Sequence, residues 1–293
     1  MLLLALAALG QNGVGFGFAT VAGPQAGPTP IVIRTTPQSA GAIQSLTWGG
    51  KEFIDASDHG RLLQSACAYD AGSPGPFNSE CYNPTEAGSL SDGNRPTTSS
   101  RLLYQKAAGI ELLTVSRPAF WLRPGEQSGG RPALNSVVTS EHLFGKHVRV
   151  GMHQNPHALD YRVTFTLPPG EAHRIGQFEA LTGYMPAEFG RFWHLLPGGR
   201  LAPLDDGPGE QPFPVILSTG DGSHAMGVWG LPDAGAVGPG YGRFRFPREG
   251  VVKWNCVYRV QSPGGLPTGD QRFRMVVAVG SLENVRVTLA NAR

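Results

Sequence analysis

The sequence is poor in charged residues and lacks the common nucleotide-binding and serine-hydrolase motifs. Charged residues make up 16% of the chain and the formal net charge is +2, a field too weak to attract nucleic acid or to attach the chain to a membrane through basic residues. The sequence holds no Gly-x-Ser-x-Gly elbow, phosphate-binding loop or dinucleotide-binding fingerprint. Serine-hydrolase chemistry, phosphoryl transfer and hydride transfer are therefore disfavoured, and no cofactor is expected.

Cysteine is also scarce, and the histidines form no recognisable metal motif. The cysteines are Cys67, Cys81 and Cys256, and none has zinc-binding spacing. In an oxidising compartment Cys67 and Cys81 can close a small loop; the alternative is three buried thiols, since a free cysteine behaves as a small hydrophobe. His153 and His157 flank a predicted turn, and no carboxylate completes a ligand set, so no metal site is expected.

Long apolar runs are missing after the first residues. Residues 1–9 are apolar, which suits the hydrophobic part of a signal peptide and is too short for a transmembrane helix. We expect residues 1–22 to be a signal peptide, residues 23–30 to be a Gly/Pro-rich linker and residues 31–293 to form a single domain. The chain is then expected to be exported to the periplasm or the cell exterior, with no membrane span.

Short apolar runs separated by turns dominate the rest of the chain. The 41 glycines and 25 prolines stand between these runs. Residues 161–167 alternate apolar and polar side chains, the pattern of a half-buried strand. Residues 171–185 are the only helix candidate, and Gly176 and Gly183 argue against a long helix there. The sequence predicts an all-β protein, a large antiparallel two-sheet β-sandwich whose closing strands reach Leu289.

A β-hairpin is predicted at residues 41–54. The apolar run 43–48 is followed by Gly49 and Gly50, which suit a two-residue type I′ turn, and then by a second apolar run. This segment resembles the first hairpin of galactose mutarotase-like β-supersandwich proteins, which are mostly carbohydrate-active. The resemblance implies that scaffold and a sugar ligand. It implies no catalytic role, because His59-Gly60 alone matches a mutarotase element and nothing matches the His-x-Tyr-Phe-Asn element.

The densest polar cluster follows this hairpin directly. It consists of Asp58, His59, Arg61 and Gln64. In a functional interpretation, Arg61 grips a carboxylate or sugar hydroxyls through its planar fork, His59 transfers a proton and Gln64 hydrogen-bonds the ligand. In the alternative interpretation, Asp58 and Arg61 form a local salt bridge that finishes the hairpin.

A second polar group contains Asn83 and Glu86. Pro84 and Gly88 predict a turn around these residues. A carboxylate in that turn can face the first cluster, and Glu86 with Asp58 would then form the pair of carboxyl groups that glycoside hydrolysis needs. Alternatively, Glu86 lies in solvent or accepts hydrogen bonds from backbone N–H groups.

Aromatic and polar residues recur further along the chain. Residues 182–194 combine aromatic rings with charged groups, and aromatic rings can stack on sugars or can belong to the core. We expect most of these rings in the core and retain the more polar residues of this and later segments as ligand-binding candidates, namely Tyr184, His194, His224, Tyr241 and Arg243.

The sequence therefore favours an exported carbohydrate-active protein that binds a glycan in a groove on one sheet. If it is a lyase, His59 or Tyr184 removes the proton while Arg61 and Gln64 stabilise the developing charge. If it is a glycoside hydrolase, Asp58 and Glu86 do the chemistry. The alternatives are a non-catalytic glycan-binding or cell-envelope β-sandwich and a sugar epimerase of the mutarotase type.

Overall fold

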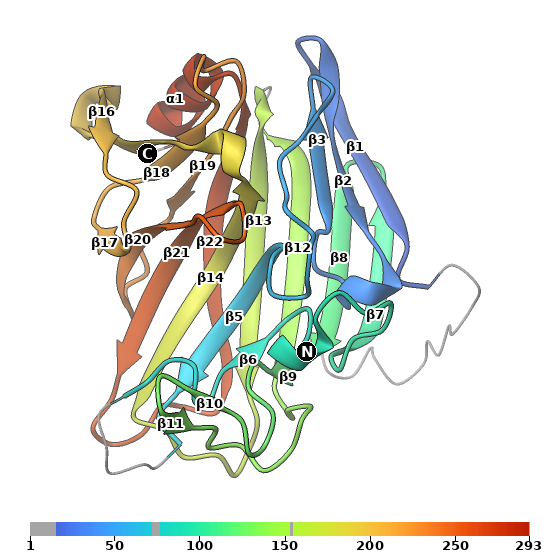
Figure 1. Ribbon diagram of the computed structural model, residues 1–293, viewed down its shortest axis with the longest axis vertical. Helices are drawn as coiled ribbons and strands as arrows, with labels where there is room; N and C mark the ends of the chain where they lie inside the picture. Colours follow the sequence, from blue (N-terminus) through green and yellow to red (C-terminus); the bar gives the residue numbers. More distant parts are fainter. Residues whose placement is uncertain (1–15, 72–76, 153–154, 293) are drawn as a thin grey trace.

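The computed structural model describes residues 16–71, 77–152 and 155–292. Within these residues the chain builds two large antiparallel sheets that pack against each other, with smaller sheets beside them (Figure 1). The prediction of an all-β two-sheet sandwich is confirmed. In this described part of the chain, no helix is long and apolar enough to cross a membrane.

The seven-stranded sheet carries the groove described below. Its central strands are long and its edge strands short, which leaves few unpaired backbone groups at the edges. In spatial order the strands are β17 (Gly209–Gln211), β20 (Val237–Phe246), β21 (Val251–Gln261), β14 (Ile175–Pro186), β5 (Leu63–Tyr69), β6 (Pro84–Thr85) and β9 (Ala119–Phe120).

The nine-stranded sheet forms the other layer of the sandwich. Its centre is the ladder between β12 (Leu143–Met152), β13 (Asn155–Leu167) and β22 (Gly269–Gly280). Beyond β22 lie β19 (Ala225–Gly230), β18 (Val215–Ser218), β15 (Arg191–Leu195) and β16 (Leu201–Leu204), and beyond β12 lie β8 (Glu111–Arg117) and β7 (Arg101–Ala108).

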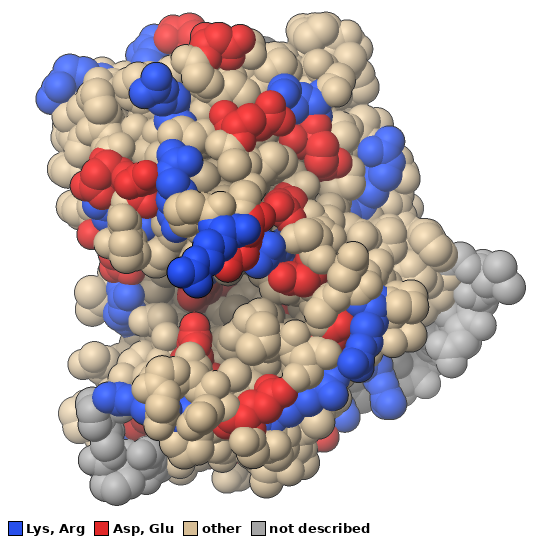
Figure 2. Space-filling view, viewed as in Figure 1, with Lys and Arg blue, Asp and Glu red and all other residues tan. Residues whose placement is uncertain are grey.

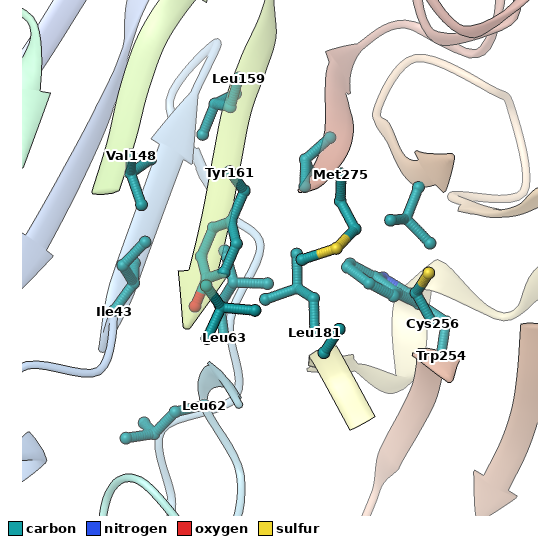
Figure 3. Close-up of a cluster of buried hydrophobic side chains, with 14 of the residues drawn as sticks. Ile43, Leu62, Leu63, Val148, Leu159, Tyr161, Leu181, Trp254, Cys256 and Met275 are labelled. Atoms are coloured by element: carbon teal, nitrogen blue, oxygen red, sulfur yellow. The ribbon is translucent and has the colours of Figure 1, made fainter. Parts of the chain in front are cut away.

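The interior between the sheets is filled by apolar side chains from both layers (Figure 3). Leu181 from β14 and Trp254 from β21 face Tyr161 from β13 and Met275 from β22, and all four are fully buried. Burying one such side chain contributes about 1.5–3 kcal/mol. Gly183 permits this packing, because a Cβ there would lie 2.5 Å from the indole ring of Trp254.

A four-stranded sheet begins the described chain, where a linker was expected. Its strands are β1 (Ala19–Ala26), β2 (Thr29–Thr35), β3 (Ser45–Trp48) and β4 (Lys51–Glu52). The predicted linker at residues 23–30 is wrong, because these residues end β1, make its turn and start β2. The signal peptide stays a prediction; residues 1–15 lie outside the described residues, and cleavage at Ala22 would cut β1.

The predicted hairpin turn is confirmed. Trp48 pairs with Lys51, and Gly49 and Gly50 have φ values of 59° and 76°. Two positive φ angles are the signature of a type I′ turn, and glycine adopts them without steric cost. Residues 136–142 form a loop, and β12 begins at Leu143.

The chain closes with a helix where strands were expected. Helix α1 (Leu282–Asn291) begins at Ser281, whose hydroxyl accepts a hydrogen bond from the backbone N–H of Asn284. The helix packs Val285 and Leu289 against the outer side of the nine-stranded sheet, in a second apolar cluster with β19 and β22.

The helix candidate at residues 171–185 is not a helix. Most of this segment lies in strand β14, in agreement with the argument from its glycines. Short 3₁₀ helices (Pro37–Ser39, Leu90–Asp92, Ala187–Phe189, Pro197–Gly199) and the pair β10 (Gln127–Ser128) and β11 (Arg131–Pro132) complete the described elements.

Candidate functional site

A groove lies on the outer face of the seven-stranded sheet, over β5, β14 and β21. Its volume is about 130 Å³. Figure 2 shows a hollow near the middle of this face, bordered by acidic and basic side chains. The lining is mostly polar and comprises Gly60, Gln64, Ala66, Cys67, Ala68, Ser79, Glu80, Asn83, Thr85, Trp121, Gln177, Glu179, Thr182, Tyr184 and Lys253.

A β-bulge in β14 places four polar side chains on the groove face. The ladder to β21 shifts its register between Glu179 and Leu181, which inserts one extra residue. Before the bulge the odd-numbered residues Gln177 and Glu179 point outward; after it the even-numbered residues Thr182 and Tyr184 do, and Leu181 enters the core. The bulge therefore concentrates ligand-facing groups on one strand.

The centre of the groove is a carboxylate paired with an ammonium group. Lys253 Nζ lies 3.2 Å from Glu179 Oε2, and the Thr182 hydroxyl donates to the same oxygen at 2.8 Å. Burial opposes ionisation of Glu179, but Lys253 and Thr182 outweigh it, so the pKa of Glu179 lies below its usual value. Burial alone would lower the pKa of Lys253, but Glu179 and Tyr184 raise it above its usual value. Both groups are therefore charged at neutral pH.

Aromatic rings hold this pair in place. The Lys253 ammonium lies 5.1 Å from the ring centroid of Tyr184 and 5.2 Å from that of Phe244, which are cation–π distances. The Tyr184 ring stacks on Phe246 at 6.3 Å. On the other side of the groove, Trp121 packs against Gly60, where a Cβ would lie 2.6 Å from the indole. The groove thus has an aromatic ring on each side of a charged floor.

Gln64 and Asn83, two predicted ligand-binding residues, do line the groove. Gln64 pairs with Thr182 across the β5–β14 ladder. Its side chain also ties the loops together, since Nε2 donates to the carbonyl of Gly60 at 3.0 Å and Oε1 accepts from the backbone N–H of Ala87 at 3.0 Å. Asn83 Nδ2 donates to the Cys67 carbonyl at 2.6 Å. These amides brace the groove as well as border it.

His59 is not placed to transfer a proton. The residue is 2% exposed, and its ring nitrogens face two backbone carbonyls, that of Ala87 at 2.9 Å and that of Arg95 at 3.0 Å. Neither nitrogen is directed at the groove. The His59 side chain instead fastens the loops that follow β6 to the loop that precedes β5, and its predicted catalytic role is contradicted by this geometry.

Asp58 and Arg61 form the local salt bridge that was the alternative prediction. Arg61 Nε lies 3.2 Å from Asp58 Oδ2, and Asp58 Oδ1 accepts from the backbone N–H of Gly60 at 2.8 Å. Both side chains stand outside the groove lining, although Gly60 between them belongs to it. The pair shapes the loop that supports Trp121.

Glu86 is buried beneath the groove and faces the core. It is 1% exposed; Lys146 Nζ lies 2.6 Å from its Oε1, and the backbone N–H of Ser65 donates to its Oε2 at 3.0 Å. A substrate cannot reach this carboxylate without opening the sandwich. Because Asp58 lies outside the groove, the structure does not bring Asp58 and Glu86 together as a hydrolytic pair.

The remaining predicted binding residues lie away from the groove. His194 stands on β15 beside Phe213, with ring centroids 5.8 Å apart. His224 packs edge-on against Trp48 at 5.5 Å. Tyr241 is buried, with its hydroxyl accepting from the backbone N–H of Gly230, and Arg243 binds the Asp205 carboxylate at 2.5 Å. The structure gives these four residues packing and bracing roles instead of a shared site.

The thiols and the remaining imidazoles of the described residues show no metal-binding arrangement. Cys67, Cys81 and Cys256 are free and buried, as in the alternative prediction. His153 lies outside the described residues, and His157 Nδ1 is hydrogen-bonded to the Val279 carbonyl at 2.8 Å. In the described ranges, no group of three or more His, Cys, Asp or Glu side chains is arranged to hold a metal ion.

Glu179, Lys253 and Trp121 belong to the groove and were missed from the sequence. A signal for Glu179 existed, because in residues 176–179 (Gly-Gln-Phe-Glu) non-polar and polar residues alternate in the manner of a half-buried strand. Lys253 stands between apolar residues on β21 and pairs with Tyr184 across the ladder. No local pattern marks Trp121, which reaches the groove from the loop after β9.

Comparisons with known proteins show the fold. No protein-family model and no curated protein matches the sequence. A galactose mutarotase-like protein from Lactobacillus casei matches with a TM-score of 0.50 and 8% identity, over 90% of this chain and 100% of that one. An α-mannosidase from Enterococcus faecalis matches with a TM-score of 0.51 and 11% identity, over 94% of this chain and 31% of that one. A family 38 glycosyl hydrolase protein from the same organism matches with a TM-score of 0.51 and 14% identity, over 94% of this chain and 32% of that one.

The chain thus spans about a third of the length of the α-mannosidase and of the family 38 protein. It has the galactose mutarotase-like β-sandwich fold, and the predicted resemblance is confirmed at that level.

Proposed function

We propose that this chain is a carbohydrate-active protein that binds a neutral sugar chain in the groove over β5, β14 and β21. The observation that carries the proposal is the combination of Trp121 and Tyr184 at opposite sides of a floor of amide, hydroxyl and charged groups. Aromatic rings stack on the apolar faces of sugars, and polar groups between them fix the orientation of the hydroxyls. The similar solved structures named as mutarotase-like and glycosyl hydrolase proteins support a sugar as the ligand.

The charge of the groove favours a neutral sugar over a uronate. The charged groups in its lining are the carboxylates of Glu80 and Glu179 and the ammonium of Lys253. Lys253 is already paired with Glu179, so an anionic sugar would meet an excess of negative charge. Arg61, the expected anchor for a uronate, stands outside the lining. The charge of the groove and the position of Arg61 therefore favour hydrolysis or epimerisation of a neutral sugar over elimination from a uronate.

The chemistry would centre on Glu179 and Tyr184. Glu179 is held ionised and can accept a proton from water or a sugar hydroxyl, whereas the Tyr184 hydroxyl can donate one. Lys253 lies between them and would stabilise negative charge that develops on the sugar. Export, as predicted from residues 1–9, belongs to this proposal because it would bring the protein to a polymeric substrate.

A non-catalytic glycan-binding protein is the second candidate. It is favoured by the contacts of Lys253 and Thr182 with Glu179 Oε2, which lower the pKa of Glu179, because a carboxylate with a lowered pKa is a weaker general base. In this case the groove provides affinity and the carboxylate only orients the ligand.

A polysaccharide panel separates these outcomes. The purified chain is incubated with neutral and uronate-containing glycans, and reducing ends, unsaturated products, anomeric exchange and retention in affinity electrophoresis are measured. For an enzyme we expect Glu179→Gln to lower kcat/KM by about a hundredfold or more, the usual loss of a general base. For a binder we expect no product, and weaker retention in Tyr184→Ala.

The matched control is Glu188→Gln. Glu188 is a half-exposed carboxylate that also pairs with a lysine, Lys51 at 2.6 Å, but it lies outside the groove. Its substitution should change neither turnover nor retention. If Glu179→Gln and Tyr184→Ala both behave like the Glu188→Gln control on every glycan that the protein binds, the groove is not the sugar site.

A further inference from the structure

A second cavity opens at the end of the sandwich, apart from the groove. It lies where the loops after β5, before β12 and between β13 and β14 meet, and its volume is about 320 Å³. Its principal walls are Tyr82, Phe120, Leu134, Asn135, Val137 and Glu171. This volume falls at the lower end of the range for small-molecule sites. We refer to it as the end cavity.

The Asn135 amide is held rigidly in the cavity wall. Asn135 is 7% exposed, and its Nδ2 donates to the carbonyls of Leu122 at 3.0 Å and Val137 at 2.9 Å. Those two bonds fix the orientation of the amide. Among the residues that the structure describes, nothing donates to Asn135 Oδ1, which is completely shielded from solvent. Because this oxygen is shielded, a ligand in the cavity does not touch it, and the fixed Asn135 amide serves as a rigid part of the wall.

A carboxylate in the same wall keeps one oxygen unoccupied. Glu171 Oε2 accepts from the Tyr82 hydroxyl at 3.0 Å and faces His173 Nε2 at 2.9 Å. In the described part of the chain, Oε1 has no hydrogen-bond partner. Burial would raise the pKa of Glu171, but the His173 hydrogen bond and the nearby His142 lower it below its usual value. The cavity therefore contains an ionised carboxylate with acceptor capacity to spare.

The other walls are apolar and aromatic. The rings of Tyr82 and Phe120 meet edge to face with centroids 4.6 Å apart. At the mouth, Leu134 is 41% exposed and Val137 is 52% exposed, although large apolar side chains are usually covered. An apolar mouth with a carboxylate further in matches a ligand that has an apolar body and a hydrogen-bond donor at one end.

We propose that the end cavity binds a small organic amine, with a primary ammonium group on an aromatic or aliphatic body. The ammonium carries three donors and a positive charge, so it can donate to Glu171 Oε1 and pair with the charge of that carboxylate. The Tyr82 and Phe120 rings attract the cation and cover the body of the ligand. A neutral alcohol of the same shape brings one donor and no charge, and binds more weakly. This site is independent of the sugar groove.

The test compares phenethylamine with 2-phenylethanol, which share one aromatic body, by isothermal titration calorimetry. We expect the amine to bind about tenfold more tightly than the alcohol, or about 1.4 kcal/mol. Glu171→Gln should remove most of that preference while leaving alcohol binding unchanged. Val137→Lys should weaken amine binding by about tenfold through like-charge repulsion at the mouth.

Two controls separate the site from general effects. Val237→Lys adds the same charge at another exposed valine, 74% exposed on β20, and should leave amine binding unchanged. Glu179→Gln in the sugar groove should also leave it unchanged, so failure of the sugar proposal and failure of this one are distinguishable. Equal affinity for amine and alcohol, or unchanged amine binding in folded Glu171→Gln and Val137→Lys, overturns the proposal. Undetectable amine binding by the wild-type protein overturns it too.

Discussion

Two glutamate–lysine pairs lie on opposite sides of the seven-stranded sheet and have opposite surroundings. Glu86 and Lys146 are 2.6 Å apart with side chains 2% and 1% exposed, whereas Glu179 and Lys253 are 3.2 Å apart with side chains 24% and 13% exposed. The first pair joins a loop of one sheet to β12 of the other. The second pair opens into the groove. Only the second can meet a ligand without unfolding.

The same difference appears in the lysines. Burial lowers the pKa of Lys146, and Glu86 offsets only part of that effect. For Lys253 burial acts in the same direction, but Glu179 and Tyr184 raise its pKa above the usual value. A buried pair is costly to desolvate and costlier to break, while a pair at the edge of water is cheap to alter. Stability should therefore depend on the first pair and ligand chemistry on the second.

The largest expected effect comes from breaking the buried pair. We expect Glu86→Ala to lower the free energy of unfolding by about 3–5 kcal/mol, because it leaves the Lys146 ammonium buried without its counter-ion. Urea unfolding followed by circular dichroism measures this loss. The double variant Glu86→Leu/Lys146→Met, which removes both charges, should recover most of it. A loss below about 1 kcal/mol in Glu86→Ala would show that water reaches the pair.

The next effect tests a buried group that has no good partner. His142 is 0% exposed and stacks on Tyr69, and its Nε2 lies 3.5 Å from Glu171 Oε2, too far for a good hydrogen bond. Burial lowers the pKa of His142 from 6.5 to about 4. Between pH 6.5 and 4 the unfolded chain binds the proton and the folded chain does not. The contribution of His142 to the free energy of unfolding should then fall by about 3 kcal/mol as the pH drops through this window, while the raised pKa of the nearby His173 acts in the opposite direction.

The variant His142→Phe keeps a ring against Tyr69 and removes the titrating group. We expect its unfolding free energy to change less with pH between 6.5 and 4 than that of the wild type, in urea titrations at several pH values. His157→Phe is the control, since His157 is half-buried and hydrogen-bonded to the Val279 carbonyl. Parallel pH profiles for wild type and His142→Phe would contradict the assignment.

The smallest expected effect on stability comes from the groove pair. Lys253→Met should change the free energy of unfolding by no more than about 1 kcal/mol, the usual value of a pair in contact with water. It should nevertheless raise the pKa of Glu179, because Lys253 is a main cause of its depression. NMR titration of the Glu179 carboxyl carbon measures that shift. An unchanged pKa of Glu179, or a stability loss as large as that of Glu86→Ala, would remove the contrast between the two pairs.

Local patterns predicted the framework well. The period-two alternation of residues 161–167 falls in β13, and the Gly49-Gly50 turn takes the expected backbone angles. Both depend on a few neighbouring residues. The closing helix was missed although Ser281 begins it with a capping interaction, because a single cap is a weak signal beside the apolar pattern of the strands.

The candidate site was predicted only in part. Gln64, Asn83 and Tyr184 reach the groove, but His59 and Glu86 turn inward and Arg61 pairs with Asp58. Loop residues have no periodicity that tells which way they point. Their direction depends on which distant segment covers them, as Ala87 and Arg95 cover His59.

The sequence by itself determined the β-sandwich, because strand alternation and turn chemistry act over a few residues and are written directly in the chain. The tertiary structure alone decided which of two glutamate–lysine pairs is buried and which faces a groove. That choice required the bulge in β14, which reverses the side-chain direction after Glu179, and the packing of one sheet on the other, which removes Glu86 from water. Both are long-range effects, since they depend on partners that lie about 60 residues or more away in sequence: Lys146 for Glu86, and Lys253 for Glu179.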